Sequence, residues 1–141
     1  MFIIHCRDCI WINFNNGIMS KYYTPSLEEF HVGFEMEGRC NNEETQGEWF
    51  EMSIDQHTKF WKDYDYRVKY LDQEDIESLG FVKWPDDDIY DLGEFQLYLG
   101  RHVEPYKVEI YDDNSQYCFV GTIKNKSELK RVLRQIGYET K

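Results

Sequence analysis

The 141-residue chain lacks any apolar run near the roughly 18–20 residues that a membrane-spanning helix needs. Its first twenty residues lack a basic leader, a long apolar core and a small-residue cleavage site, which are the marks of a secretory signal. We therefore expect a cytoplasmic protein with no membrane partner.

Motifs of known enzymes and cofactor sites are also missing. The sequence contains no G-x-S-x-G, Walker loop, G-x-G-x-x-G or H-E-x-x-H. His57 and His102 have no triad partner nearby in the sequence. These absences favour a non-enzymatic protein, so we assign no catalytic residue, no cofactor and no metal.

Four cysteines are too few and too scattered for the disulfide framework of a small secreted protein, which favours free thiols in a reducing compartment. Cys6 and Cys9 have the C-x-x-C spacing of half a zinc site or of a redox pair. No second C-x-x-C or H-x-x-x-H follows, although His5 and Cys40 could in principle complete a zinc site. The residues after Cys9 resemble a strand rather than the helix of a redox motif. Coincidence is the favoured interpretation, and metal binding by Cys6 and Cys9 stays open.

The N-terminal twenty residues have two interpretations. Met19 begins the clear patterning, so residues 1–18 fit an upstream extension. Alternatively, Phe2–Cys6 and Ile10–Phe14 suit edge strands. Both stay open. We divide the chain into residues 1–20, an extension or edge strand, and residues 21–141, a single α+β domain.

Apolar and polar residues alternate in several segments, as in strands with one buried face. The segments are Phe30–Met36, Trp49–Ile54, Tyr66–Tyr70, Phe95–Leu99, Tyr106–Ile110 and Tyr117–Ile123. Short turns between them favour antiparallel pairing. Two further segments are predicted as a short helix or turn at 24–30 and an acidic loop at 84–91.

The last element is the most strongly marked helix. Asn125 is a capping residue with Glu128 three residues later, Gly137 ends the segment, and apolar residues repeat with helical spacing at Leu129, Val132, Leu133 and Ile136. A shorter helix is predicted between Asp72 and Gly80. The predicted fold class is α+β: an antiparallel, partly curved sheet of five to seven strands with short helices and a C-terminal amphipathic helix packed on one face.

Negative charge is the most unusual feature of the composition. The net charge is −11, yet residues 122–141 carry +4, so the other 121 residues carry −15. Such a surface repels nucleic acid and anionic lipid, and it suits a basic protein partner. Solubility alone is the plainer explanation of the acidic surface, and cations near a helix C-terminus also complement its dipole.

Candidate partner-binding residues are acidic or tryptophan side chains on predicted outward strand faces or in the acidic loop, because exposed tryptophans anchor many interfaces. They are Glu35, Glu37, Trp49, Glu51, Trp84, Asp86, Asp87 and Asp88. His31, Glu35 and Glu37 also have the chemistry of an acid–base or metal site. Asp86, Asp87, Asp88 and Asp91 have the chemistry of a calcium loop. A solvated strand and a solvated loop are the favoured interpretations of these two groups.

Three segments carry a resemblance: Tyr23–Glu37, Tyr70–Gly80 and Gly121–Lys130. With them, most of residues 21–137 resembles a group of small uncharacterised proteins of Bacteroidetes-type bacteria and their phages. The resemblance implies a phage or mobile-element setting, and hence the host cytosol, but no activity and no site residue. Small acidic proteins in that setting often block host machinery, including defence nucleases.

The leading hypothesis is a phage-type accessory protein that binds and inhibits a host protein, such as a CRISPR effector, by competing for its basic nucleic-acid-binding surface. It predicts no direct nucleic-acid binding. A second hypothesis is a binding protein that sequesters a signalling nucleotide through Arg67, Lys69, Arg101 or the C-terminal helix together with stacking aromatics. A third is a hydrolase that uses His31 and Glu35. The partner and the oligomeric state stay open.

Overall fold

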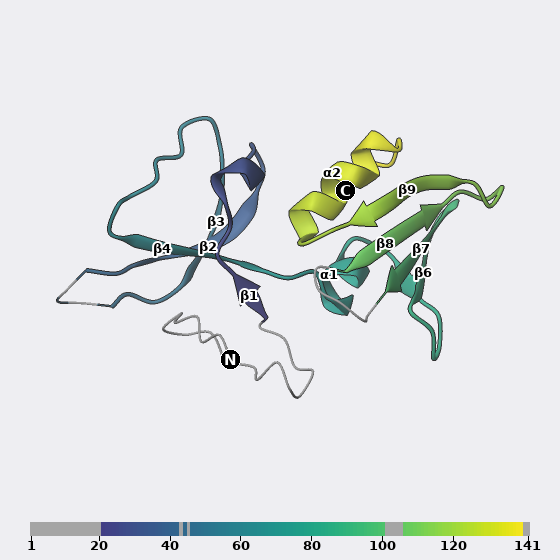
Figure 1. The fold of residues 1–141 in the computed structure, drawn as a ribbon, viewed down its shortest axis with the longest axis horizontal. Coiled ribbons are helices and arrows are strands. Elements are labelled where there is room, and N and C mark those ends of the chain that lie inside the picture. Colours follow the sequence, from purple (N-terminus) through teal and green to yellow (C-terminus); the bar gives the residue numbers. More distant parts are fainter. Residues whose placement is uncertain (1–20, 43, 45, 101–105, 140–141) are drawn as a thin grey trace. The chain divides into compact units, whose positions relative to one another are not determined.

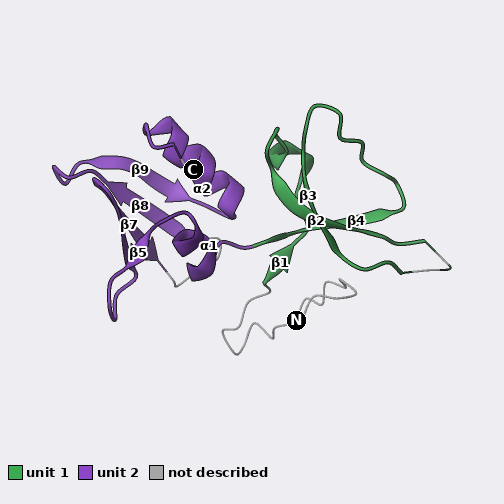
Figure 2. Ribbon diagram, turned by 180° about the vertical axis from the view of Figure 1, so that it is seen from behind, with its two compact units in different colours: residues 1–69 green, residues 70–141 purple. Residues whose placement is uncertain are grey.

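The computed structural model describes residues 21–42, 44, 46–100 and 106–139, which form two compact units, residues 1–69 and 70–141 (Figure 2). The C-x-x-C of Cys6 and Cys9, the N-terminal candidate strands, Arg101 and His102 lie outside the described residues. Within the described residues, no helix is long and apolar enough to cross a membrane.

Unit 1 is a four-stranded antiparallel sheet with the strand order β1-β4-β2-β3 (Figure 1). Its elements are β1 (Tyr22–Tyr23), the 3-10 helix η2 (Leu27–Glu29), β2 (Glu35–Cys40), β3 (Phe50–Ser53) and β4 (Tyr64–Lys69). One face of this sheet carries the buried side chains Phe34, Met36, Ile54 and Val68, and the rings of Phe30 and Tyr66 pack against them. The alternating pattern therefore separates an apolar face from a charged one, as expected for antiparallel strands.

The predicted strand Phe30–Met36 is wrong from Phe30 to Phe34, since β2 begins only at Glu35. The N–H of Gly33 donates to Ile54 O at 2.7 Å and the N–H of Phe34 donates to His31 O at 3.0 Å, so the chain turns here. Gly33 has φ 90°, a conformation that glycine adopts without steric cost. Val32, predicted inward, is consequently 68% exposed.

Unit 2 is a five-stranded antiparallel meander with the strand order β5-β6-β7-β8-β9 and two helices. Its elements are α1 (Gln73–Ser78), β5 (Val82–Lys83), β6 (Ile89–Leu92), β7 (Phe95–Gly100), β8 (Lys107–Tyr111), β9 (Tyr117–Thr122) and α2 (Lys126–Gln135). The segment predicted as an acidic loop at 84–91 is therefore the tip of a β5–β6 hairpin together with most of β6.

Both helices of unit 2 begin as their cap residues predict. Asp72 accepts a hydrogen bond from Asp75 N at 2.9 Å, and Asn125 accepts one from Glu128 N at 2.8 Å. The Glu128 carboxylate accepts from Lys124 N, one residue before the position expected in a capping box. Gly137 has φ 95° just after α2, which confirms its role in ending the helix.

The core of unit 2 lies between the sheet and α2. Phe95, Leu97 and Leu99 of β7 are buried in one cluster with Leu129 and Leu133 of α2. Residues between them along β7, such as Gln96 and Tyr98, point to the opposite face of the sheet. α2 thus covers one face of the meander only (Figure 1).

The α+β class, the antiparallel pairing and the C-terminal helix packed on a sheet are confirmed. The strands nevertheless form two sheets of four and five rather than one sheet of five to seven, and the chain has two compact units, residues 1–69 and 70–141. The boundary lies between Lys69 and Tyr70, where β4 leads to α1 without glycine, proline or a polar linker. Alternation identifies buried faces but not which strands share a sheet, so the division is invisible in the sequence.

Candidate protein-binding surface

The sheet of unit 2 has one face that α2 does not cover, called here the open face. The antiparallel register places on it the side chains of Val82, Trp84, Asp91, Gln96, Tyr98, Glu109, Tyr111, Tyr117 and Val120. Four of these are exposed: Val82 by 69%, Trp84 by 40%, Tyr117 by 61% and Val120 by 50%. No other large hydrophobic residue among the described part of unit 2 is exposed to this degree.

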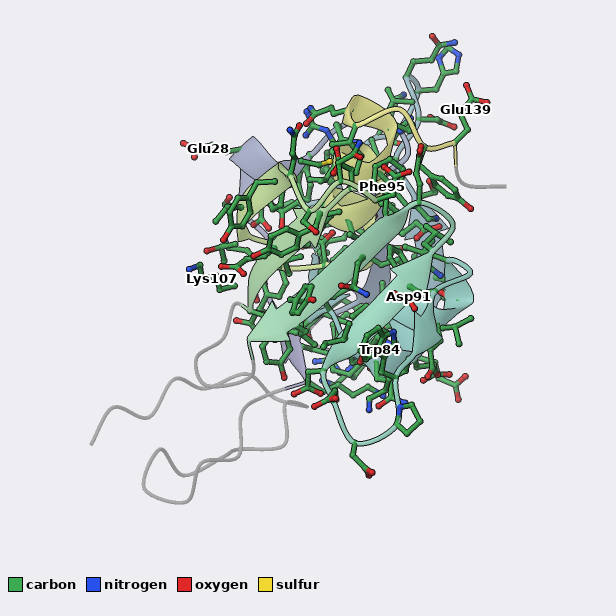
Figure 3. The ribbon with its side chains drawn as sticks, turned by 90° about the vertical axis from the view of Figure 1, so that its right-hand side faces the viewer. Glu28, Trp84, Asp91, Phe95, Lys107 and Glu139 are labelled. Atoms are coloured by element: carbon green, nitrogen blue, oxygen red, sulfur yellow. The ribbon has the colours of Figure 1, made fainter. Side chains whose placement is uncertain are left out.

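Asp91 joins two strands and a loop on the open face (Figure 3). Its Oδ2 accepts a hydrogen bond from Trp84 Nε1 at 2.6 Å, and its Oδ1 accepts one from Gln96 Nε2 at 2.8 Å. Tyr98 donates in turn to Gln96 Oε1 at 2.6 Å. This chain of hydrogen bonds fixes the indole of Trp84 against β6, so an exposed aromatic ring is held in one orientation.

Three tyrosines form a row across β7, β8 and β9. The ring centres of Tyr98 and Tyr111 lie 5.1 Å apart, and those of Tyr111 and Tyr117 lie 4.4 Å apart. The Tyr111 hydroxyl donates to Glu109 Oε2 at 3.1 Å. Hydrogen bonding to Tyr117, desolvation and the Glu109 carboxylate raise the pKa of Tyr111, so its phenol keeps its proton to a higher pH than an ordinary tyrosine does.

The acidic residues Asp86, Asp87 and Asp88 lie in the loop between β5 and β6, next to Trp84 in the sequence. Asp86 and Asp87 are exposed, and Asp88 is half-buried with its carbonyl accepting from Leu99 N at 2.9 Å. Asp86 has φ 62°, an uncommon conformation that aspartate tolerates better than most residues. The loop adds negative charge to one end of the open face.

The other four predicted binding residues lie on the charged face of unit 1. Glu35 and Glu51 are exposed, whereas Glu37 is half-buried and pairs with Arg67, with Oε2 to Nε at 2.8 Å. Glu37 faces both Arg67 on β4 and Glu51 on β3 in the ladder. Arg67 is therefore the cation that offsets the repulsion between two facing carboxylates.

Trp49 is half-buried rather than an exposed anchor. Two arginines lie against its ring, with Arg67 Cζ at 4.1 Å and Arg39 Cζ at 4.5 Å from ring centres. The ring of Tyr22 also lies against Arg67, with its centre 3.8 Å from Cζ. The Trp49 Nε1 atom is buried and has no hydrogen-bond partner within the described residues. These four residues, named here the arginine–aromatic stack, join β1, β4, β2 and the residue before β3.

The two arginines of the arginine–aromatic stack have little charge available to bind a phosphate ligand. Arg39 is 97% buried and its Nε lies 3.3 Å from Asp65 Oδ2, while Arg67 pairs with Glu37. An arginine already paired with a carboxylate cannot supply its full charge to a phosphate. This geometry lends no support to the nucleotide hypothesis at Arg67.

The hydrolase hypothesis required His31 and Glu35 to share a strand face. His31 lies in the turn before β2, with its Nδ1 3.0 Å from Val32 O and its ring packed against Phe34. The predicted same-face arrangement with Glu35 and Glu37 is therefore wrong. Across the part of the chain that the structure describes, no group of three His, Cys, Asp or Glu residues is placed to hold a metal ion.

The structure thus brings Trp84 and the loop aspartates together at one end of the open face, while Glu35, Glu37, Trp49 and Glu51 belong to unit 1. Sequence reasoning considered Asp91 only as part of an acidic loop, and it missed the tyrosine row. Gln96 and Tyr98 alternate with the buried residues of β7, which was a sufficient signal that a tyrosine faces outward.

Comparison of the chain with protein-family models, with curated proteins and with solved structures found no match. The resemblance to Bacteroidetes and phage proteins therefore stays a prediction.

Proposed function

We propose that this protein is a binding module that docks the open face of unit 2 onto a basic surface of a partner protein. The observation that carries the proposal is the position of the exposed hydrophobic residues of unit 2. Val82, Trp84, Tyr117 and Val120 all lie on the one sheet face that no helix covers. Val82 and Trp84 lie at the β5 edge of this face and Tyr117 and Val120 at its β9 edge, so exposed side chains flank the face on both sides. Exposed tryptophan and tyrosine are frequent anchors of protein interfaces.

Charge supports a basic partner. Residues 70–121 hold thirteen acidic and three basic residues, a net charge of −10. Asp91 and Glu109 bring carboxylates onto the open face, and the 86–88 loop adds more at its edge. The exposed Lys107 lies on the same face and pairs with Glu109 at 3.4 Å, so Asp91 and the loop carry the negative charge that stays available to a partner. Arginine is the partner side chain that fits best, because it both stacks on Trp or Tyr rings and pairs with carboxylates.

Rigidity of the aromatic residues adds to the affinity expected of this face. Trp84 is held by Asp91 at 2.6 Å, and Tyr111 stacks on Tyr117 at 4.4 Å. Side chains that are already ordered lose less entropy on binding than free ones.

The proposal extends to a phage-type inhibitor that covers the basic nucleic-acid-binding surface of a host protein, such as a defence effector.

The experiment compares capture of host proteins by the wild-type chain and by a variant of the open face. Tagged wild type and the double variant Trp84→Ala with Tyr117→Ala are incubated with lysate of a Bacteroidetes-type bacterium treated with nuclease. Trp61→Ala is the matched control, since Trp61 is 62% exposed in unit 1. Retained proteins are identified by mass spectrometry and eluted with a salt gradient.

The proposal predicts that wild type and Trp61→Ala retain one basic protein in similar amounts. The double variant should retain at least tenfold less of it. Its elution is expected by about 0.5 M NaCl, where surface charges are strongly screened. Added duplex DNA or RNA should compete with the chain for this protein. Equal retention by the double variant, or retention that salt does not weaken, would overturn the proposal.

A further inference from the structure

The last strand of the meander, β9, has one edge that no other described strand pairs with. Among the strands that the structure describes, it pairs with β8 and is last in the strand order of unit 2 (Figure 1). Ile123 N donates to Tyr106 O at 3.1 Å, so these two residues are a hydrogen-bonded pair. Hydrogen-bonded pairs alternate along an antiparallel ladder, which turns Gly121 and Phe119 toward β8. The N–H and C=O groups of Val120 and Thr122 consequently point to the free edge.

Natural edge strands are usually protected by charge, proline or short length. The other edge strand of this sheet, β5, has two residues and includes Lys83, and β3 at the edge of unit 1 carries Glu51. β9 has six residues with no charge and no proline, and Val120 and Thr122 are exposed. It therefore keeps the features that favour pairing with another strand.

The absence of charged residues in and around β9 indicates what kind of strand could pair with its edge. Residues 114–123 are ten consecutive uncharged residues in a chain in which 30% of residues are charged. A docking site for a basic strand would be expected to carry carboxylates on or beside β9. An uncharged strand suits a second copy of the same chain, because pairing two identical uncharged strands brings no like charges together across the edge.

We propose that two copies of this chain pair through β9, antiparallel across a two-fold axis, to form one continuous ten-stranded sheet. In the register that pairs the edge-facing N–H and C=O groups of β9, Val120 of each copy exchanges both backbone hydrogen bonds with Thr122 of the other. Gly121 then faces Gly121 in a non-hydrogen-bonded pair, where Cα atoms approach to about 4.5 Å.

Phe119 explains why glycine suits the centre of this pair. A Cβ on Gly121 would lie only 2.9 Å from Phe119 Cζ, so the ring already occupies the space beside the glycine. An aromatic ring over an edge glycine shields the backbone that glycine leaves exposed. The two Phe119 rings would therefore cover the paired glycines on the α2 side of the joined sheet.

The test is the mass of the purified full chain by light scattering at about 1 to 200 µM, since dimerisation depends on concentration. We expect twice the chain mass of 17.1 kDa at the high end. Val120→Pro should give the monomer mass, because proline is tolerated on an edge strand but removes the outward donor. Circular dichroism and thermal unfolding would check that this variant is folded.

Val120→Lys provides a second variant should the proline disturb β9, since it sets two cations close together across the axis. Val82→Lys is its matched control, because it adds the same charge to another exposed valine of the open face. Val120→Lys should be monomeric and Val82→Lys dimeric. In addition, amide exchange at Val120 and Thr122 should slow as the protein concentration rises.

A wild-type monomer at every concentration, or a Val120→Lys variant that dimerises as well as Val82→Lys, would overturn the inference. The measurement contains no partner protein and the inference does not rest on the proposed function. Failure of one therefore leaves the other standing.

Discussion

The guanidinium carbon of Arg67 lies 4.1 Å from the centre of the Trp49 ring. The same carbon lies 3.8 Å from the centre of the Tyr22 ring. The Nε atom of Arg67 lies 2.8 Å from Glu37 Oε2. One arginine thus connects β1, β2, β4 and the residue before β3 on the charged face of unit 1. Since unit 1 has only a small buried apolar cluster, this face has to contribute to its stability as well.

Arg67→Ala is expected to destabilise unit 1 by about 2–4 kcal/mol, because it leaves the half-buried Glu37 facing Glu51 and removes two ring contacts. The measurement is urea unfolding followed by tryptophan fluorescence in a background with Trp11, Trp61 and Trp84 replaced by phenylalanine, so that the signal comes from Trp49. Lys62→Ala removes an exposed cation from the same unit and should change stability by less than about 0.5 kcal/mol. Equal losses in the two variants would show that net charge, not the stack, explains the effect.

Asn125→Ala is expected to destabilise unit 2 by about 1–2 kcal/mol. The side chain of Asn125 is 2% exposed and accepts from Glu128 N at 2.8 Å, so alanine leaves that donor without its cap. Asn125→Asp keeps an acceptor and should retain most of the stability in thermal unfolding. Asn114→Ala, in the exposed β8–β9 turn, is the control. A loss in Asn125→Asp as large as in Asn125→Ala would rule out capping as the cause.

The elements that the sequence predicted well are those whose signals are local. α2 has its cap, its apolar stripe and its terminal glycine within thirteen residues, and all three have the expected roles. β7 shows strict alternation and is buried at each predicted position. In both cases the physical determinant lies within the element itself, so one sequence is sufficient.

What the sequence could not predict depends on contacts between distant segments. Trp49 was expected outside because it alternates with Phe50, yet Arg67, eighteen residues later, covers its ring. Asp91 was expected in a solvated loop. The pairing of β6 with β7 instead places Gln96 Nε2 2.8 Å from Asp91 Oδ1. Strand pairing decides both environments, and a single sequence carries no record of which strands pair.

Gly80→Ala is expected to destabilise unit 2 by about 1–2 kcal/mol, because Gly80 has φ 99° directly after α1. A Cβ there would also lie 3.4 Å from Leu92 Cδ1, a contact without a serious clash, so backbone conformation is the main cost. Gly80→Asn is the matched variant, since asparagine tolerates this region better, and it should lose clearly less stability. Chemical denaturation of the three proteins measures the difference. Equal losses would assign the cost to crowding instead.

The thiol of Cys118 on β9 is expected to react slowly. Desolvation and the nearby carboxylates of Asp112 and Glu94 raise its pKa, because each disfavours the thiolate. The reactive form is the thiolate, so the alkylation rate should reach half its maximum at a higher pH in the folded chain than in the unfolded one. The measurement is the pH dependence of iodoacetamide labelling with Cys6, Cys9 and Cys40 replaced by serine.

Asp112→Asn tests the electrostatic part of this prediction. Asparagine keeps an oxygen that can accept from Asn114 N and Gln116 N, both 2.9 Å from Oδ1, while the charge is removed. The pKa of Cys118 should fall, and labelling at pH 8 should quicken by about two- to fivefold, the effect of one partly screened charge. Asp113→Asn removes an equal charge from the next residue, which does not raise this pKa, and should leave the rate within error. The same acceleration in both variants would mean that Cys118 responds to the overall charge of the chain rather than to Asp112.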